Sequence, residues 1–386
     1  MDIKIIPSKL SGTIEAIASK SYAHRILIAA ALSNRTTRVH MSGLSDDIAA
    51  TIGALRAMGA ETCVNEQEIT VFPIAPKAKP LIFCKESGTT ARLLLPVAAA
   101  LYNEATITGE GSLLARPFDS LCEAMEANGC RFDSKKLPIT FSGQLSAGQY
   151  SISGQESSQF VSGLLFALPL MEGKSSINLL SPLQSKGYVD MTIHILRLFG
   201  IAGEYEIEGR QSYISPGRIT VEGDWSNAAF WLACGVQVSG LSLDSLQKDK
   251  SFIYLKEQDV IDIADVPDLA PILAVCSSVK KGRTAIINAA RLRLKESDRL
   301  QSVLKMICDL GGDASLDGDG MIIWGKSKLR GGCVDSCNDH RLVMAAAIAS
   351  CFCQEPVIIR NAQAVNKSYP DFFKHFNQLG GRASVI

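Results

Sequence analysis

Apolar positions along the chain follow two different periods. Segments such as DIAATIGALRAMG and ESDRLQSVLKMICDL repeat apolar residues at the spacing of an amphipathic helix. Runs such as ATITGEG and SINLLSP have the composition of short strands. The two kinds of segment alternate from one end of the chain to the other. The pattern therefore predicts an α/β protein.

A helical segment that ends in glycine and leads directly into a strand-like run recurs along the sequence. Glycine suits such an end because it adopts the left-handed conformation of a helix C-cap. The spacing is about 70 residues apart from one longer interval, and the residues concerned are Gly59, Gly129, Gly200, Gly311 and Gly380. Helix ends of this kind are common in α/β proteins, but their near-equal spacing favours an internal repeat over coincidence.

The one long interval indicates a repeat that has lost part of its structure within about 224–290, in the stretch SLQKDKSFIYLKEQDVIDI. A change of domain near VEGDW leaves three repeats before it and three after, counting the shortened one. We expect an N-terminal-type domain at 19–220. A discontinuous C-terminal-type domain would comprise 1–18 plus 221–386, with an active site in the cleft between the two.

Composition limits the kinds of function. The chain has 386 residues, a length typical of two domains, and 47% of them are hydrophobic, enough for a sizeable core. Lys+Arg and Asp+Glu both total 39, so there is no overall basic field of the kind that attracts nucleic acid or membranes. The start MDIKIIPSKL does not resemble a signal peptide, and no segment reaches the roughly 18 apolar residues of a membrane span. We expect a cytoplasmic location.

The 11 cysteines are scattered through apolar segments, which indicates reduced and mostly buried thiols. One group lies close together in sequence and raises the question of zinc, but it lacks the paired CxxC spacing of structural sites: Cys333, Cys337, His340, Cys351 and Cys353. We predict no metal.

Polar residues come just before apolar helices at several places. The clearest sets are Lys20, Ser21 and Arg25 in SKSYAHR, Gly88 and Thr89 in SGTTARLL, and Ser157, Ser158 and Gln159 in SSQF. Cations and free backbone amides at the start of a helix suit a phosphate or another anion. Solvated surface charges, ordinary turns and serine N-caps would look the same, so none of these segments decides alone.

RLRLKESDRL is the densest group of charges. On a helix, Lys295 and Arg299 would share a face at i,i+4, with Glu296 one residue from it. An exposed helix laced with salt bridges is the ordinary explanation for such a run. A second polar group, Asp339-His340-Arg341, again precedes an Ala-rich apolar helix, which favours a site.

Taken in order, these segments closely resemble the 5-enolpyruvylshikimate-3-phosphate synthase (3-phosphoshikimate 1-carboxyvinyltransferase) family. The matching segments are SKSYAHR, SGTTARLL, ARP, SSQF, SKGYVD, VPDLAP, RLKESDRL, NDHRLVMA and NKSYPDFF. KESDR and NDHR together are the most specific. The resemblance implies a two-domain inside-out α/β barrel, each domain being built from three βαβαββ-type units. The shortened unit near 246–262, inferred above from the glycine spacing, departs from that pattern.

The resemblance also implies a reaction. The enolpyruvyl group of phosphoenolpyruvate would pass to the 5-hydroxyl of shikimate 3-phosphate with release of phosphate, in the shikimate pathway to chorismate and the aromatic amino acids. It implies a monomer that needs no metal or organic cofactor and has no nucleic-acid or membrane partner. Glyphosate would bind at the phosphoenolpyruvate site.

Site residues follow by motif. The shikimate 3-phosphate site would contain Lys20, Ser21, Arg25, Ser157, Ser158, Gln159, Ser185, Asp268 and Lys295, with Tyr188 adjacent. The phosphoenolpyruvate site would contain Lys20, Gly88, Arg116, Gln159, Arg299, Arg341 and Lys367, while Thr89 and His340 complete the binding set. Asp268 would be the base and Glu296 the acid, and Lys20 would stabilise the departing phosphate or help to transfer a proton.

Four features depart from the usual family pattern: Ala18, Glu86, Arg291 and the shortened unit near 246–262. Leu93 also stands where some glyphosate-sensitive members have proline. Glu86 matters most, because it places a negative charge near an anion site, where it must point away or pair with a cation such as Arg92.

Three other functions remain as alternatives. A UDP-N-acetylglucosamine enolpyruvyl transferase usually has a cysteine in the loop that here reads GEGSLLARP, and it lacks KESDR. An RNA 3′-phosphate cyclase-like protein fits poorly with zero net charge and the absence of a basic, aromatic-bearing groove sequence. A catalytically dead binding protein is disfavoured because every catalytic motif is intact.

Overall fold

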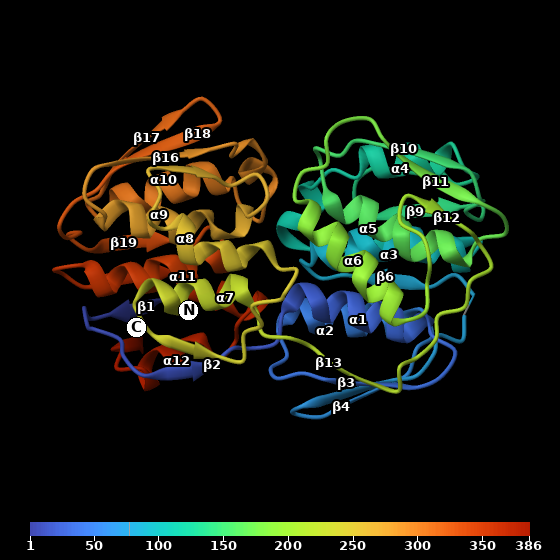
Figure 1. Cartoon of the computed structure of the whole chain (residues 1–386), viewed down its shortest axis with the longest axis horizontal. Coiled ribbons are helices and arrows are strands. Elements are labelled where there is room, and N and C mark those ends of the chain that lie inside the picture. Colours follow the sequence, from blue (N-terminus) through green and yellow to red (C-terminus); the bar gives the residue numbers. More distant parts are fainter. Residues whose placement is uncertain (77) are drawn as a thin grey trace. The chain divides into compact units, whose positions relative to one another are not determined.

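The computed structural model describes residues 1–76 and 78–386. Its contacts divide the chain into two compact units (Figure 1). We call Lys20–Val221 the contiguous unit, and Met1–Ser19 with Glu222–Ile386 the split unit. Each boundary lies one residue from the expected position.

The contiguous unit alternates strands and helices throughout. Its elements are α1 (Lys20–Leu32), β3 (Thr37–His40), α2 (Asp46–Ala57), β4 (Thr62–Val64), β5 (Glu68–Val71), β6 (Leu81–Phe83), α3 (Gly88–Leu101), β7 (Glu104–Thr108), η1 (Gly111–Ala115), α4 (Asp119–Glu126), β8 (Arg131–Phe132), β9 (Ile139–Ser142), β10 (Gln149–Ile152), α5 (Ser158–Ala167), η2 (Leu168–Leu170), β11 (Ser175–Leu179), α6 (Lys186–Leu198), β12 (Glu206–Ile207) and β13 (Arg218–Thr220).

The split unit repeats this alternation. Its elements are β1 (Ile3–Ile5), β2 (Thr13–Glu15), α7 (Trp225–Ala233), β14 (Gln237–Ser239), η3 (Lys248–Ser251), α8 (Phe252–Leu255), β15 (Val260–Asp262), η4 (Pro267–Leu269), α9 (Ala270–Val279), β16 (Arg283–Ile287), η5 (Ala290–Leu294), α10 (Arg299–Asp309), β17 (Asp313–Asp317), β18 (Gly320–Trp324), β19 (Gly332–Asp335), α11 (His340–Ala349), η6 (Ser350–Phe352), β20 (Val357–Arg360), η7 (Ala362–Lys367), α12 (Phe372–Gln378) and β21 (Ala383–Val385).

Four sheets share one topology. In each, two parallel strands are followed by an antiparallel third neighbour and an antiparallel edge strand, in the orders β13-β3-β5-β4, β6-β7-β9-β8, β15-β16-β18-β17 and β19-β20-β1-β21. In three of the sheets a helix joins the two parallel strands, α3 between β6 and β7, α9 between β15 and β16, and α11 between β19 and β20. In the fourth sheet, β13 comes from the end of the contiguous unit and pairs with β3 from its beginning. The repeat is thus a βαβαββ unit, as predicted.

Two sheets are incomplete. One is β10-β11-β12, and the other is the two-stranded β14-β2. The latter falls in the stretch predicted to be shortened, where the helix α8 has only 4 residues. The shortened unit is therefore found where the long interval between stop glycines placed it.

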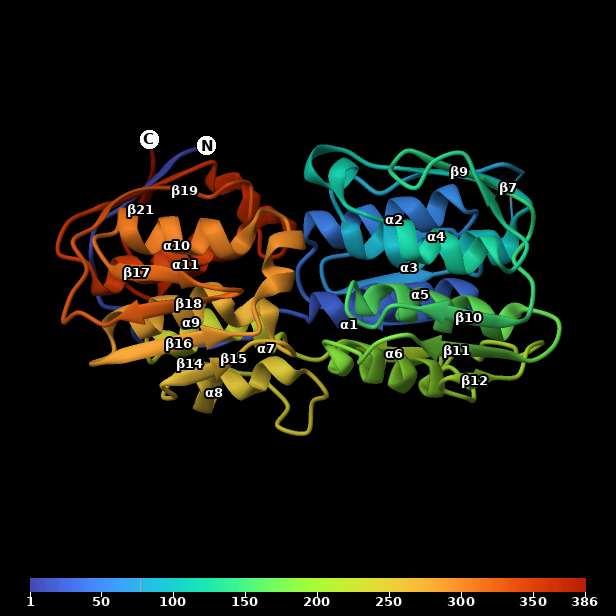
Figure 2. The ribbon, with the colours of Figure 1, turned by 90° about the horizontal axis from the view of Figure 1, so that it is seen from above.

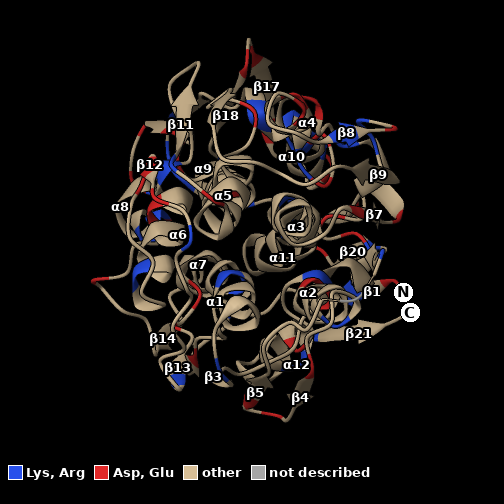
Figure 3. Ribbon diagram, turned by 90° about the vertical axis from the view of Figure 1, so that its right-hand side faces the viewer, with Lys and Arg blue, Asp and Glu red and all other residues tan. Residues whose placement is uncertain are grey.

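Apolar helices form the centre of each unit. The helices α1, α3 and α5 of the contiguous unit and α7, α9 and α11 of the split unit are buried along nearly their whole length. A helix that is apolar on all sides is stable only when neighbours cover it on all sides. In Figures 2 and 3 the strands lie outside these helices, and in Figure 3 the charged residues lie mostly on the helices, strands and loops that surround them. Helices lie inside and sheets outside, and no sheet among the described residues closes into a β-barrel.

The N-terminal strand belongs to the last repeat. Strand β1 pairs antiparallel with β20 and with β21, so that Ile3 lies opposite both Ile359 and Val385. The first strand therefore lies in the split unit.

Each stop glycine has the left-handed backbone that was expected: φ is 100° at Gly59, 104° at Gly129, 78° at Gly200, 81° at Gly311 and 99° at Gly380. At Gly59 a side chain would also collide with the Ala75 carbonyl. Within 1–76 and 78–386, no helix has the length and apolar character to span a membrane.

Candidate active site

Polar side chains gather where the buried helices begin, in one cluster in each unit. The helix-start cluster of the contiguous unit comprises Lys20, Arg25, Gly88, Thr89, Arg92, Arg116, Ser157, Ser158, Gln159, Ser185 and Tyr188. The carboxylate cluster of the split unit comprises Asp268, Lys295, Glu296, Arg299, Asp339, His340, Arg341 and Lys367.

Lys20 opens helix α1 and forms an ion pair with the first turn of α2. Its Nζ lies 2.7 Å from Asp47 Oδ2, and both side chains are about seven-eighths buried, with exposures of 15% and 13%. Asp47 lies beside the Ser45 N-cap of α2. The pair fixes the ammonium in one position, and nothing in the sequence around Asp47 marked it as a partner.

Arg25 is fully buried among the helices of the contiguous unit. Its Nε donates to Thr192 Oγ1 at 2.7 Å and its Nη2 to the Tyr188 carbonyl at 3.0 Å. Its Nη1 donates to the Ser21 carbonyl at 2.9 Å. Burial lowers the pKa of Arg25 to about 10, although the Tyr188 and Tyr22 side chains raise it. Nε and Nη2 thus tie α1 to α6, while the bond of Nη1 stays within α1. A direct bond from Arg25 to a phosphate stays a prediction.

The turn before α3 is closely packed. Ser87 is the N-cap and accepts from the Thr90 amide at 3.3 Å. Arg116, at the end of η1, reaches this turn, since a Cβ on Gly88 would lie 2.7 Å from its Nη1. Glu86 lies over η1, where a side chain on Gly111 would collide with its carboxylate. The structure therefore brings Gly88 and Arg116 together, as the predicted anion site requires.

Gln159 links α5 to α3. Its Nε2 donates to Thr89 Oγ1 at 2.8 Å, and its Oε1 accepts from Arg92 Nη1 at 3.1 Å. The Arg92 guanidinium lies 5.7 Å from the Phe118 ring and 5.3 Å from the Phe160 ring, where cation–π attraction holds it. Arg92 was not in the predicted set, yet it orients a residue that was.

The serines of this cluster occupy helix starts. Ser157 is the N-cap of α5, so the ordinary explanation of that serine is correct, and Ser158 is the first helical residue. Ser185, before α6, has a left-handed backbone with φ of 53°. Such conformations in non-glycine residues gather at functional sites. Tyr188 follows on α6, with its ring centroid 5.9 Å from the Arg25 guanidinium.

Asp268 is the carboxylate with the most cationic neighbours in its cluster. Its Oδ1 accepts from Arg299 Nη1 at 2.8 Å and from Lys295 Nζ at 3.4 Å, and Oδ2 lies 3.7 Å from Arg341 Nη2. Burial would raise the pKa of Asp268, but Lys295, Arg341 and Arg299 outweigh it and hold that pKa well below its ordinary value. Asp268 is therefore ionised at neutral pH.

Arg299 holds three carboxylates at once. Its Nε donates to Asp339 Oδ2 at 2.9 Å and its Nη2 to Glu296 Oε2 at 2.6 Å, in addition to the bond to Asp268. Burial would lower its pKa, but Asp339, Glu296 and Asp268 raise it above the ordinary value. With an exposure of 1%, Arg299 is a fixed cation that orders the cluster.

The predicted helical face of Lys295 and Arg299 is wrong. Helix α10 begins only at Arg299, because the Asp298 side chain caps it by accepting from the Gln301 amide at 3.2 Å. Lys295 ends η5 with an extended backbone. The loop, rather than a shared helical face, brings Lys295 to Asp268, and burial lowers the Lys295 pKa while Asp268 opposes that shift.

The start of α11 joins the cluster through its cap. Asp339 accepts from the Arg341 amide at 2.9 Å while its carboxylate also holds Arg299. Two nitrogens of Arg341, Nε and Nη1, are buried and have no hydrogen-bond partner among the described residues. They are donors that an anion would satisfy. Lys367 donates to the Asn338 carbonyl at 2.8 Å, next to this cap, and His340 is buried in the first turn.

Asp249 is a functional candidate that the sequence did not reveal. It lies in η3 of the shortened unit, is 3% exposed, and has an Oδ1 without a hydrogen-bond partner among the described residues. Burial, together with the negative charges of Asp268 and Asp224, raises its pKa to about 7 against the opposing effect of Arg341. The shortened unit thus places a titratable carboxyl within electrostatic reach of Asp268.

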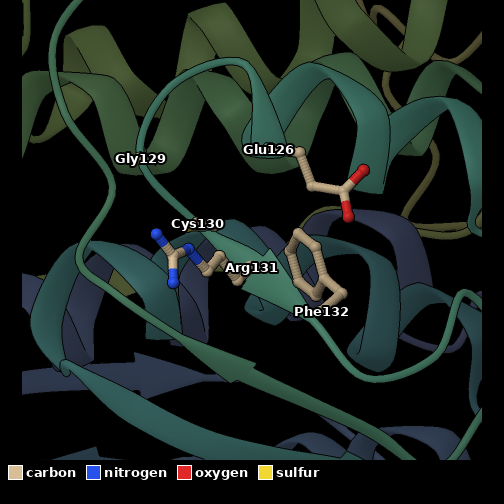
Figure 4. Close-up of a pocket in the computed structure, with 5 residues that line it drawn as sticks. All are labelled: Glu126, Gly129, Cys130, Arg131 and Phe132. Carbon is tan, nitrogen blue, oxygen red and sulfur yellow. The ribbon is translucent and has the colours of Figure 1, made fainter.

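The described residues hold no metal-binding group, and a hollow in the contiguous unit lies outside the two clusters. Among residues 1–76 and 78–386, no group of three or more His, Cys, Asp and Glu side chains is arranged to hold a metal. A hollow of about 460 Å³ at the end of α4 is lined by Glu126, Gly129, Cys130, Arg131 and Phe132 (Figure 4) and includes no residue of either cluster.

Comparison with known proteins decides the family. The family model described as EPSP synthase (3-phosphoshikimate 1-carboxyvinyltransferase) matches residues 5–257 and 234–376. The chain belongs to this family. The two stretches matched by the EPSP synthase model overlap at 234–257, in the shortened unit.

Individual members of the EPSP synthase family are similar to this protein along nearly its whole length. The 3-phosphoshikimate 1-carboxyvinyltransferase of Clostridium novyi is 41% identical over 98% of this chain and 98% of its own. The 3-phosphoshikimate 1-carboxyvinyltransferase of Clostridium kluyveri is 40% identical, and the match covers 98% of this chain and 97% of the Clostridium kluyveri protein. The structure of EPSP synthase from Acinetobacter baumannii has a TM-score of 0.81, covers 100% of both chains and is 24% identical, which supports the two-unit fold.

Proposed function

We propose that this chain is a 3-phosphoshikimate 1-carboxyvinyltransferase. It transfers the enolpyruvyl group of phosphoenolpyruvate to the 5-hydroxyl of shikimate 3-phosphate and releases phosphate. The observation that carries the proposal is the carboxylate cluster, in which the ionised Asp268 shares Arg299 with Glu296 while Arg341 keeps two buried donors for an anion. Carboxylates for proton transfer and a guanidinium for a phosphate or carboxylate are what this reaction needs.

The reaction proceeds by addition and elimination. The 5-oxygen of shikimate 3-phosphate bonds to C2 of phosphoenolpyruvate while Asp268 takes the hydroxyl proton. Glu296 supplies the proton that C3 gains in this step. Loss of a proton from C3 and of phosphate from C2 then restores the double bond, and Lys20 stabilises charge on the departing phosphate.

Binding roles follow the two clusters. For phosphoenolpyruvate, Arg116 beside Gly88 in the contiguous unit and Arg341 and Lys367 in the split unit supply donors to the phosphate and carboxylate. The sequence led us to expect Arg299 as a direct ligand of phosphoenolpyruvate, but its bonds to three carboxylates favour another role. We assign it to the orientation of Asp268 and Glu296.

Shikimate 3-phosphate needs donors to its phosphate, hydroxyls and carboxylate. We assign these to Ser21, Arg25, Ser157, Ser158, Gln159, Ser185, Tyr188 and Lys295. Both substrates are multiply charged metabolites that do not cross membranes unaided, so we propose a cytoplasmic enzyme, which acts as a monomer and without a cofactor.

The test is release of inorganic phosphate from purified protein supplied with both substrates, and with each alone. We expect release only when both are present, and product carrying the enolpyruvyl ether at the 5-position. Asp268→Asn should remove most turnover while the fold is kept, since an amide oxygen still accepts from Arg299. Phosphate release without shikimate 3-phosphate, or transfer to UDP-N-acetylglucosamine instead, would overturn the proposal.

A further inference from the structure

A continuous chain of buried hydrogen bonds crosses three helices of the contiguous unit. His24 Nδ1 on α1 lies 2.6 Å from Thr51 Oγ1 on α2, and Thr51 Oγ1 lies 2.6 Å from Thr90 Oγ1 on α3. Thr90 Oγ1 then donates to Ser87 Oγ at 2.8 Å. Figure 1 shows α1 and α2 side by side. These hydrogen bonds connect helix α1, which begins at Lys20, with the turn that contains Gly88.

None of the four side chains meets solvent. His24, Thr51 and Thr90 are fully buried, and Ser87 is 1% exposed. Breaking one of these bonds would leave a buried hydroxyl without a hydrogen-bond partner, which costs the full desolvation free energy of that group. Each hydrogen bond therefore restricts the positions of the two side chains that it joins. Helices α1 and α3 are therefore coupled through Thr51 as well as through apolar packing.

The bonds have a definite direction. Thr90 has one hydroxyl proton and gives it to Ser87, so its other bond must be accepted from Thr51. Thr51 then has no proton left and must accept from His24, whose Nδ1 carries the hydrogen. His24 stays neutral because burial lowers its pKa well below the ordinary value, with Lys20 and Arg25 adding to the shift. Its Nε2 is buried without a partner among the described residues.

The series of hydrogen bonds that starts at His24 ends at the turn formed by Ser87 and Gly88. Ser87 caps α3 by accepting from Thr90, and Gly88 follows it against Arg116. Thr89, the next residue, accepts from Gln159. The turn is thus held on one side by Gln159 and on the other by the chain from His24.

We propose that His24 and Thr51 are positioning residues that set the Ser87–Gly88 turn for phosphoenolpyruvate. Neither touches the substrate, and both act through Thr90 and Ser87. This inference rests on the function proposed above, because it assigns phosphoenolpyruvate to the Gly88 turn.

The decisive variant is Thr51→Val, which keeps the shape of the side chain and removes both of its hydrogen bonds. We expect the KM for phosphoenolpyruvate to rise about five-fold or more, with kcat within about two-fold of wild type, since the turn shifts but the proton-transfer groups do not. Thr51→Ser keeps the hydroxyl and should restore the wild-type KM.

Thr37→Val is the matched control. Thr37 is fully buried, and its hydroxyl lies 2.7 Å from Ser215 Oγ, in a pair that includes no residue of the helix-start cluster. It should lower stability as Thr51→Val does while leaving the KM unchanged. Equal KM effects of the two valine variants, or a wild-type KM in folded Thr51→Val, would overturn the inference.

A second comparison of variants tests whether His24 donates the hydrogen bond to Thr51. His24→Asn places an amide N–H near the former Nδ1 and should keep the KM within about two-fold, whereas His24→Leu should raise it like Thr51→Val. Equal KM values for the two variants would contradict the inference. If Thr51→Val does not fold, Thr51→Cys gives the same test with weaker hydrogen bonds. An inactive wild type would instead reject the proposed function.

Discussion

The Nη1 atom of Arg116 occupies the space that a side chain on Gly88 would need. A Cβ at Gly88 would lie 2.7 Å from that nitrogen and 3.6 Å from Leu113 Cδ1. Glycine at this position therefore lets the arginine close over the start of α3. The clash involves the end of a flexible side chain, so a substitution here displaces the guanidinium without breaking the fold.

Gly88→Ala should weaken binding of glyphosate, a small phosphonate expected at the phosphoenolpyruvate site, more than it weakens substrate binding. Overpacking of this kind costs ~1–3 kcal/mol, or roughly one to two decades in affinity. We expect the wild type to be inhibited competitively with phosphoenolpyruvate. Inhibition constants at fixed shikimate 3-phosphate measure the effect.

The control for that experiment is Gly53→Ala in α2, where an added Cβ meets nothing within 4 Å. It should leave the inhibition constant unchanged. A wild type that glyphosate does not inhibit, or an unchanged constant in Gly88→Ala, would show that this turn does not bind the phosphonate.

Glu296→Gln should reduce kcat by at least ~10²-fold with little change in substrate binding, the usual scale for a general acid or base. The fold should survive because an amide oxygen can still accept from Arg299 Nη2, now 2.6 Å from Glu296 Oε2. Steady-state kinetics with both substrates measures the change. Glu123→Gln, at an exposed ion pair with Lys135, serves as control. A wild-type kcat in Glu296→Gln would remove this residue from the acid role.

Asp339→Ala should destabilise the protein by about 3–5 kcal/mol, the range found when one partner of a buried ion pair is removed. Arg299 would lose two hydrogen bonds while buried, and α11 would lose its cap. Chemical denaturation measures the loss. Asp309→Ala breaks a largely exposed i,i+4 pair with Lys305 and should change stability by no more than about 0.5 kcal/mol. Similar losses in both variants would contradict the central role of Arg299.

Asp249 should make stability depend on pH. Its pKa is raised to about 7 in the folded protein, so its contribution is complete below the unfolded value near 3.8 and is lost as pH rises through about 7. Relative to Asp249→Asn, the wild-type free energy of unfolding should fall by about 2–3 kcal/mol between pH 5 and pH 8. Urea denaturation at several pH values measures this difference.

The other carboxylates act in another pH range. Asp268 has a lowered pKa, so its contribution is present above its ordinary value and is lost only as pH falls below about 4. It cannot mimic the effect of Asp249 above pH 5. Asp244→Asn, an exposed change in the same segment, should show no pH-dependent difference from wild type. Parallel curves for wild type and Asp249→Asn would mean that Asp249 is ionised throughout.

Sequence patterns predicted the repeat well because its signals are local. A glycine such as Gly311 ends a helix through its own backbone, and the longer interval before it located the shortened unit. Polar residues before apolar helices likewise located Lys20, Gly88 and Arg341. Each of these signals depends only on neighbours within one or two turns.

The partners of those residues were not predictable in this way. Asp47 and Thr192 reach Lys20 and Arg25 only through packing of α2 and α6 against α1, and Asp249 reaches Asp268 across the split unit. The error at Lys295 had a local cause, because the capping tendency of Asp298 outweighed the helical spacing of charges. Local sequence patterns therefore do not reveal which residues of distant segments come into contact in the folded protein.

The pairing of β1 with β20 and β21 has a consequence for synthesis of the chain. The contiguous unit is encoded without interruption and can fold once residue 221 has left the ribosome, whereas the last sheet needs residues 3–5 and 383–385 together. Strand β1 is made first and stays unpaired until β20, and then β21, have been made. Closing so long a loop is slow, so the split unit should be the later of the two to acquire protection against proteolysis during translation.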